Sequence, residues 1–172
     1  MSIKAEIRKE NYVLQQLDAT QWQNYKKIRL EALRTDPGVF GSNYRKEAAY
    51  TQQEWVDLLD NQNCIMFGLY DQGNIVGITG AVLDRDDLSN AILIASFIQE
   101  PHRGKGLSKL FYQARIAWAR QKQCVRITVS HRAGNESSKA ANQAFNFSYS
   151  HAQEVEWPDG TSAAELMYVL KL

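Results

Sequence analysis

The stretch FIQEPHRGKGLSKLF, residues 97–111, carries two glycines and two basic residues between an apolar run and a segment of helical spacing. Gly104 and Gly106 permit positive φ angles and close backbone approach, and Arg103 and Lys105 add positive charge beside them. A loop that leads from a buried strand into a helix presents free N–H groups at the positive end of the helix dipole. The pattern is typical of an anion site, and equally typical of a tight turn with solvated basic side chains.

The same stretch does not match two common nucleotide-binding motifs. It lacks the GxxxxGK[ST] sequence of a P-loop, so no lysine–serine pair is set up for a nucleoside triphosphate. It also lacks the GxGxxG fingerprint followed by an acidic residue at Rossmann spacing. Cys64 and Cys124 lie far apart and match no metal-ligand spacing, so we expect no metal and two buried thiols.

Hydrophobic periodicity predicts an alternation of strands and helices around this loop. The expected order is β-α-α-β-β-β-α-β-α-β-β, which indicates an α/β fold of helices on a mixed sheet. AILIASFI is nearly continuous in apolar residues, as in a central strand that is covered on both faces. The expected strands lie within 3–17, 64–71, 75–84, 91–98, 124–130, 147–157 and 163–172. The expected helices lie within 21–35, 45–61 and 135–145, with another that begins at Leu107 and shows its apolar spacing as far as Trp118.

Two segments carry a resemblance to a known family. RGKGLS, residues 103–108, resembles the R/Q-x-x-G-x-G/A coenzyme A loop of the GNAT superfamily of N-acetyltransferases, with Ser108 where Gly or Ala is usual. NESSKAANQAFNF, residues 135–147, is similar to the helix and strand that follow in that family, although Asn146 replaces the usual Gly. The resemblance covers essentially the whole chain, so we expect one domain over residues 1–172.

The resemblance also implies a fold and a cosubstrate. It implies a mixed, mostly antiparallel sheet of about six to seven strands, flanked by about four helices and splayed between the fourth and fifth strands. The fourth strand is then 91–98 and the fifth 124–130. Acetyl-CoA would enter this wedge. The residues expected to bind it are Phe97, Ile98, Arg103, Gly104, Lys105, Gly106, Leu107, Ser108, Asn135 and Ser138.

The implied reaction is direct attack of an uncharged amine on the thioester, which needs a base for the amine and a donor for the oxyanion. Family members commonly place a Tyr hydroxyl near the sulfur, and the matching position here is Asn142. Three readings follow: the thiolate leaves unassisted or through water, another hydroxyl such as Tyr149 or Ser138 substitutes, or the protein binds acetyl-CoA without efficient turnover. The last reading describes a non-catalytic acyl-CoA-binding regulatory module, the alternative to an enzyme.

The sequence does not single out the general base that would deprotonate the amine. His131 has an intrinsic pKa suited to proton transfer, although a His at a strand end is more often solvated. The other candidates are Glu31, Glu47, Asp84, Asp86 and Asp87.

The charge composition of the chain limits the classes of partner that we expect. The 172-residue chain has a net charge of +1, and its basic residues are scattered, so we expect neither nucleic acid nor membrane as a partner. The N-terminal MSIKAEIRKE has no apolar run of signal-peptide length, so the expected location is the cytosol. The expected partners are acetyl-CoA and an amine of a small molecule or protein, and the family resemblance also allows a homodimer.

Overall fold

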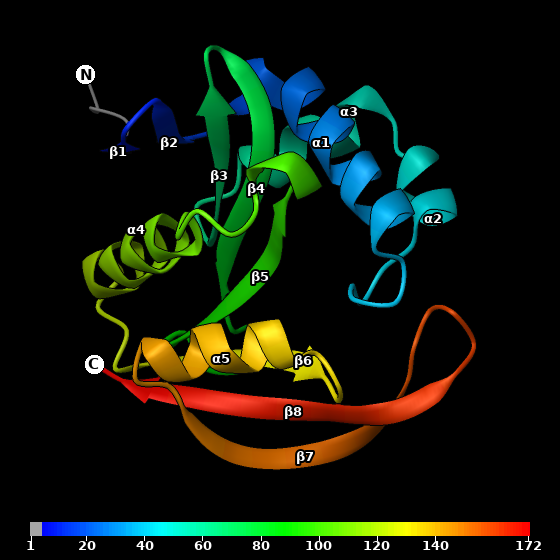
Figure 1. Cartoon of the computed structure of the whole chain (residues 1–172), viewed down its shortest axis with the longest axis vertical. Helices are drawn as coiled ribbons and strands as arrows, with labels where there is room; N and C mark the ends of the chain where they lie inside the picture. The colour runs from blue at the N-terminus through cyan, green and yellow to red at the C-terminus, as the bar shows by residue number, and fades with distance from the viewer. Residues whose placement is uncertain (1–4) are drawn as a thin grey trace.

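The computed structural model describes residues 5–172. They form one eight-stranded sheet with five α-helices (Figure 1). The strands are β1 (Glu6–Lys9), β2 (Tyr12–Gln16), β3 (Cys64–Asp71), β4 (Asn74–Leu83), β5 (Asn90–Ile98), β6 (Arg126–Arg132), β7 (Ser148–Glu156) and β8 (Ser162–Lys171). The helices are α1 (Trp22–Thr35), α2 (Tyr44–Ala48), α3 (Gln52–Leu59), α4 (Ser108–Gln121) and α5 (Glu136–Ala144), with single 3-10 turns at Ala19–Gln21 and Glu100–His102.

The strand order is β1-β2-β3-β4-β5-β6-β8-β7, and β5–β6 is the parallel pair among antiparallel neighbours. The expected mixed, mostly antiparallel sheet is confirmed, with somewhat more elements than the sequence indicated. One reason is a turn at Glu10, whose φ of 54° breaks the single strand expected near the N-terminus into β1 and β2. Residues 3 and 4 of that expected strand lie outside the described residues.

The helices cover the sheet on both faces, and each face has its own apolar core. One core contains the apolar stripe of α4, including Leu110, Phe111 and Trp118. The other contains Ile28 of α1 and Trp55 of α3. Because the side chains of a strand alternate between faces, β4 contributes to both cores. None of the helices in the described part of the chain is long and apolar enough to cross a membrane.

β5 and β6 separate soon after they meet. Their pairing is confined to Asn90–Ile92 on β5 and Arg126–Thr128 on β6, while β5 runs on to Ile98. In Figure 1, β3 to β5 therefore run in a different direction from β7 and β8 below them. The splay expected between strands 91–98 and 124–130 is confirmed, and it opens a gap in the middle of the sheet.

Candidate active site

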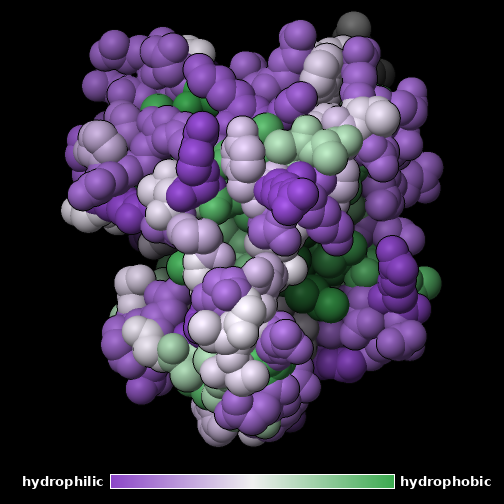
Figure 2. All heavy atoms as spheres, turned by 90° about the vertical axis from the view of Figure 1, so that its right-hand side faces the viewer, coloured by the Kyte–Doolittle hydropathy of each residue, from purple (hydrophilic) through white to green (hydrophobic). Residues whose placement is uncertain are grey.

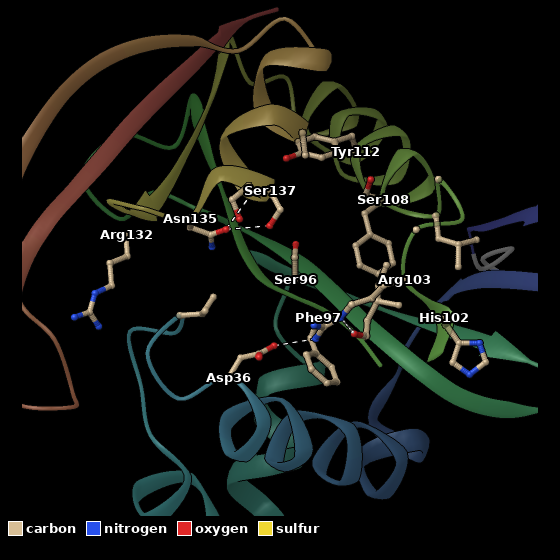
Figure 3. A pocket seen from close by; sticks show the side chains of 18 of the residues that line it. Asp36, Ser96, Phe97, His102, Arg103, Ser108, Tyr112, Arg132, Asn135 and Ser137 are labelled. Atoms are coloured by element: carbon tan, nitrogen blue, oxygen red, sulfur yellow. Dashed lines mark hydrogen bonds and ion pairs between the residues drawn. The ribbon is translucent and has the colours of Figure 1, made fainter. Parts of the chain in front are cut away.

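A cavity of about 810 Å³ occupies the side of the molecule where β5 and β6 part. Figure 2 shows a largely hydrophilic face with hydrophobic atoms gathered in a hollow between its upper and lower parts. The walls come from the end of β5, the glycine loop, the first turns of α4, the β6–α5 loop and the loop after α1. Segments far apart in sequence thus meet around one opening (Figure 3).

The glycine loop takes the conformation that its sequence predicts. Gly104 and Gly106 have φ angles of 74° and 70°, in the left-handed region that favours glycine. The loop leads into α4. The N-cap residue of this helix is Leu107, whose side chain accepts no hydrogen bond from the amides of the first turn. The Leu110 amide donates to the Leu107 carbonyl at 3.0 Å, and the amides of Ser108 and Lys109 are left for another acceptor, as at a helix N-terminus that binds an anion.

Basic side chains gather beside these amides. Lys9 of β1 donates from Nζ to the Lys105 carbonyl at 2.9 Å, and Lys105 Nζ donates to the Tyr12 hydroxyl at 3.3 Å. The same hydroxyl lies 2.8 Å from His102 Nδ1. The chain therefore brings positive charge from β1 to the loop, and the sequence pattern of the loop alone did not reveal Lys9.

Arg103 fixes the loop instead of extending freely. Its Nε donates to the Ile98 carbonyl at 2.6 Å, and its Nη2 donates to Asp36 Oδ2 at 2.9 Å, so it links β5 to the end of α1 (Figure 3). Its guanidinium also lies 5.6 Å from the centroid of the Phe97 ring. Arg103 thus sets the position of the loop relative to the cavity.

The structure brings nearly all the expected cofactor residues together. Lys105 is the exception, because its side chain turns toward Tyr12 instead. The expected residues that line the cavity are Phe97, Ile98, Arg103, Gly104, Gly106, Leu107, Ser108, Asn135 and Ser138. Asn135 is also the N-cap of α5, since its Oδ1 accepts from the Ser138 amide at 3.2 Å.

A bulge in β5 shapes the inner end of the cavity. The register against β4 shifts between Ile78 and Gly80, and Ala95 has a φ of 60°. A bulge turns a strand locally and leaves backbone groups outside the ladder. The Ser96 hydroxyl lies 2.8 Å from Thr79 Oγ1 and accepts from Arg115 Nη1 at 3.0 Å.

A second cavity of about 120 Å³, here called the inner chamber, shares Ser96, Tyr112, Arg115, Asn135 and Ser138 with the first. Its other walls come from the Val39–Phe40 segment, β5, β6 and α5. The inner chamber therefore lies next to the main cavity, at the point where the sheet splits.

Two of the three expected catalytic residues line the inner chamber. Asn142 is 1% exposed, and His131 is 6% exposed, so this histidine is buried where the sequence suggested a solvated one. Tyr149 is 57% exposed on β7 and lines neither cavity. Its partner in an edge-to-face contact is Tyr168, at a centroid distance of 5.8 Å.

His131 is held in one tautomer by its backbone neighbour. Its Nδ1 donates to the Arg132 carbonyl at 2.9 Å, because a carbonyl oxygen only accepts. The ring stacks on Tyr168 at a centroid distance of 5.3 Å. Nε2 is buried and finds no partner among residues 5–172, so its lone pair is free to accept a proton.

The other candidate bases are engaged elsewhere. Glu47 forms a buried pair with Arg29 through two hydrogen bonds of 2.9 Å. Burial alone would lower the pKa of Arg29, but the hydrogen bonds and charge of Glu47 outweigh it and raise that pKa. Glu31 accepts from Gln99 at 3.0 Å, and Asp87 pairs with Arg126. Neither these acids nor Asp84 and Asp86 line a cavity described above.

Tyr112 is the residue that the sequence analysis missed. It lies on the inner face of α4, is 6% exposed and lines both cavities. Its hydroxyl donates to Asn142 Oδ1 at 2.5 Å, and its ring stacks on Phe145 at 4.4 Å. Burial raises the pKa of Tyr112, so the hydroxyl keeps its proton at neutral pH. Only the fold brings this hydroxyl to Asn142, which is 30 residues away.

Arg132 closes the far side of the site. Its Nη1 donates to the Gly38 carbonyl at 3.2 Å and to Asp159 Oδ2 at 2.8 Å, which ties the loop after α1 to the β7–β8 turn. The hydrogen bonds from Thr161 and Arg132 hold the pKa of Asp159 well below its usual range. No cluster of His, Cys, Asp and Glu suited to a metal occurs in the described part of the chain.

Comparison with known proteins now identifies the family. The model of the acetyltransferase (GNAT) family matches residues 22–147, which span most of the chain. The chain belongs to the GNAT family of acetyltransferases. No curated protein sequence gives a significant match. The family places this GNAT chain among the enzymes that transfer acyl groups, and the loop and splayed sheet described above lie largely within the matched residues.

Solved structures share the fold of this GNAT protein at low sequence identity. A GNAT-family acetyltransferase from Streptococcus pneumoniae superposes with a TM-score of 0.79 at 18% identity, covering 94% of this chain and 99% of that one. The ribosomal-protein-S5-alanine acetyltransferase from Vibrio fischeri gives 0.81 at 13%, with coverage of 97% and 96%. The ribosomal L7/L12 alpha-N-protein acetyltransferase RimL, in complex with coenzyme A, gives 0.78 at 15%, with 98% of both chains covered.

Proposed function

We propose that this protein transfers an acetyl group from acetyl-CoA to a primary amine in a ternary complex, within one domain that spans residues 1–172. The observation that carries the proposal is the gap between β5 and β6, which opens directly beside a glycine loop at the N-terminus of α4. The loop amides and the ammonium group of Lys9, which donates to the loop at the Lys105 carbonyl, suit a pyrophosphate. The unpaired part of β5 suits an extended amide-bearing arm.

In this proposal, each cofactor residue acts mainly through its backbone or its position. Phe97 and Ile98 pair through their backbone groups with the pantetheine arm, as a partner strand would. The amides from Gly104 to Ser108 hold the pyrophosphate, while the Arg103 amide donates to the Glu100 carbonyl at 3.1 Å. Asn135 and Ser138 contact the arm from the start of α5.

His131 is the base that the geometry supports best. It lines the inner chamber and carries a buried Nε2 lone pair that has no protein partner among the described residues. An amine of pKa about 10 is mostly protonated at neutral pH, so proton removal must accompany attack on the thioester. His131 Nε2 takes that proton, and the backbone near the β5 bulge stabilises the oxyanion.

Tyr112 serves as the acid for the departing sulfur. Its hydroxyl meets Asn142 at the position where a Tyr of α5 was expected to act. Rotation of the Tyr112 hydroxyl about its C–O bond turns its proton from Asn142 Oδ1 toward the departing thiolate, and Asn142 Nδ2 keeps its place in the chamber wall. Asn142 positions this hydroxyl, and Tyr149 stays outside the site.

The structural relatives suggest which acceptors to test first. Two of them act on ribosomal proteins, so N-terminal peptides of ribosomal proteins belong in the first acceptor panel beside small amines. We expect action in the cytosol, as the sequence indicates.

Turnover is the test of this proposal. Release of free CoA from acetyl-CoA, followed with a thiol reagent across peptide and small-amine acceptors, should appear with at least one amine. Formation of the acetylated amine, checked by mass spectrometry, separates transfer from thioester hydrolysis. Tight acetyl-CoA binding without product on any acceptor would favour the non-catalytic module instead.

A further inference from the structure

Arg115 is a buried cation without a carboxylate partner. It is 3% exposed on the inner face of α4, and its Nε donates to the Phe111 carbonyl at 3.1 Å. Its guanidinium lies 4.9 Å from the Tyr112 ring centroid. Among residues 5–172 no Asp or Glu pairs with it, whereas Arg29, which is also buried, pairs with Glu47.

An unpaired buried charge is costly to a fold, because water no longer solvates it. Burial lowers the pKa of Arg115 to about 10, so the side chain still carries its charge at neutral pH. The contacts with Phe111, Ser96 and Tyr112 solvate the cation only with neutral groups.

The inner chamber, which Arg115 lines, has no acidic residue in its wall. Asn142 Nδ2, a second hydrogen-bond donor on this wall, is buried and has no partner among the described residues. Glu165, whose carboxylate accepts from Ser130 and Gln153, is not among the lining residues. The chamber therefore offers a cation and a free donor to a ligand, and nothing anionic.

The volume of the chamber limits the size of that ligand. Its roughly 120 Å³ corresponds to about four water molecules in the liquid. A short chain of four or five heavy atoms that ends in a carboxylate has a suitable size. A guanidinium forms two parallel hydrogen bonds with a carboxylate, which makes arginine the side chain best suited to such a group.

We propose that the inner chamber binds a carboxylate group through Arg115 and Asn142, so that the enzyme prefers a reactant that carries one close to the reacting centre. This inference rests on the proposed function, and it names a specificity. The carboxylate has two sources: the acyl chain of a dicarboxylic acyl-CoA, such as succinyl-CoA, or the acceptor, such as a free amino acid. The bound carboxylate takes no part in the chemical step, and none of its bonds forms or breaks.

The first arm of the test measures binding without an acceptor. We expect the wild-type protein to bind succinyl-CoA at least about tenfold more tightly by calorimetry than valeryl-CoA, an uncharged chain of equal length, as for one charge-assisted pair. Acetyl-CoA is measured beside them as the reference for the cofactor site.

The second arm uses acetyl-CoA as donor and compares alanine with alaninamide as acceptors. A carboxylate on the acceptor should raise kcat/KM at least about tenfold, by the same reasoning. The amide has the less basic amine and thus more of its uncharged form, so amine ionisation works against the expected preference.

Variants of Arg115 test whether this side chain causes the preference for a carboxylate in either arm. Arg115→Gln should bring the favoured ratio close to one, and Arg115→Lys should keep part of it. Arg120→Gln, which removes an exposed charge from the same helix, is the matched control and should leave both ratios unchanged.

The outcomes separate this inference from the proposed function. Ratios near one in both arms, with acetyl-CoA bound and turned over, overturn the carboxylate site and leave the proposed function intact. A preference that persists in Arg115→Gln also overturns it. Failure of every acyl-CoA to bind overturns both proposals. Because the wild-type ratios decide the first question, the test stands even if Arg115→Gln does not fold.

Discussion

At the scale of single residues, the site depends on polar groups that are buried at the split in the sheet. The Tyr112 hydroxyl reaches Asn142 from the opposite helix, and His131 presents an unpartnered nitrogen nearby in the same chamber wall. In the proposed function, catalysis depends on which atoms face the inner chamber, and less on where their residues stand in a motif.

Tyr112→Phe tests the acid directly, because it removes the hydroxyl and keeps the stacked ring. We expect kcat for amine acetylation to fall about 100-fold, the usual effect of losing a general acid. The KM for acetyl-CoA should stay within about threefold, since the hydroxyl acts on the leaving group in the transition state. Steady-state kinetics with the best acceptor provide the measurement.

Tyr149→Phe is the matched control for that change, since this tyrosine is 57% exposed on an edge strand. It should leave both constants unchanged. If Tyr112→Phe instead retains the wild-type kcat while chemistry limits the rate, the sulfur leaves without help from Tyr112.

Glu47→Gln tests the buried ion pair that joins α1 to α2. The side chains of Arg29 and Glu47 are 11% and 7% exposed, so loss of the Glu47 charge leaves a buried cation unpaired. We expect the free energy of unfolding to fall by about 3–5 kcal/mol. Urea denaturation followed by tryptophan fluorescence gives this value.

Replacement of both partners, Arg29→Met with Glu47→Leu, is the informative comparison for that loss. It should recover much of the stability, because no unpaired charge remains. A double variant as unstable as Glu47→Gln would show that packing, and not charge, holds α2 in place.

At the scale of elements, the loop between β5 and α4 depends on backbone conformation. Gly106 has a φ of 70°, and a Cβ there would lie 2.9 Å from Lys9 Nζ. We expect Gly106→Ala to raise the Kd for acetyl-CoA about tenfold, since strain of about 1–2 kcal/mol is relieved only when the loop moves. Calorimetry measures the change.

Gly73→Ala controls for the strain itself. Gly73 has a φ of 82° in the β3–β4 turn, with open space around its Cβ position. This variant should lose similar stability and keep the wild-type Kd. Equal Kd values for both variants would mean that the loop amides do not hold the ligand.

At the scale of the whole molecule, the two parts of the sheet meet through a short seam. β5 and β6 pair over three residues each, so a ligand that fits the gap bridges both parts. Acetyl-CoA at 100 times its Kd should stabilise the folded state by about 2.7 kcal/mol. For a chain of this size that is a rise in Tm of roughly 5–10 °C. Differential scanning calorimetry, with ATP as the control ligand, would reveal the shift, and an unchanged Tm would argue against binding in the gap.

The sequence predicted the parts of the site that depend on local backbone. The loop of Gly104 and Gly106, the strand before it and the helix after it follow from glycine conformation and periodicity, which are local properties. The sequence could not predict the groups that meet only through tertiary packing. Tyr112 and Asn142 are 30 residues apart in the sequence. Arg115 lies within a predicted helix, and no motif in the sequence marks it as a residue of the site. Hydrophobic periodicity shows which face of a helix points into the protein, but it does not show which groups a polar atom on that face contacts.

The short seam also affects how the backbone exchanges with solvent. Beyond Ile92, amides of β5 that face the gap have no neighbouring strand to protect them, although they lie in the middle of the sheet. In deuterium they should exchange as quickly as the amides of an outer edge strand. A pantetheine arm that pairs with β5 would slow them, so the rate of deuterium uptake over residues 93–98 becomes an internal gauge of occupancy. Deuterium uptake in this central strand would thereby report binding more directly than uptake in the edge strands of the sheet.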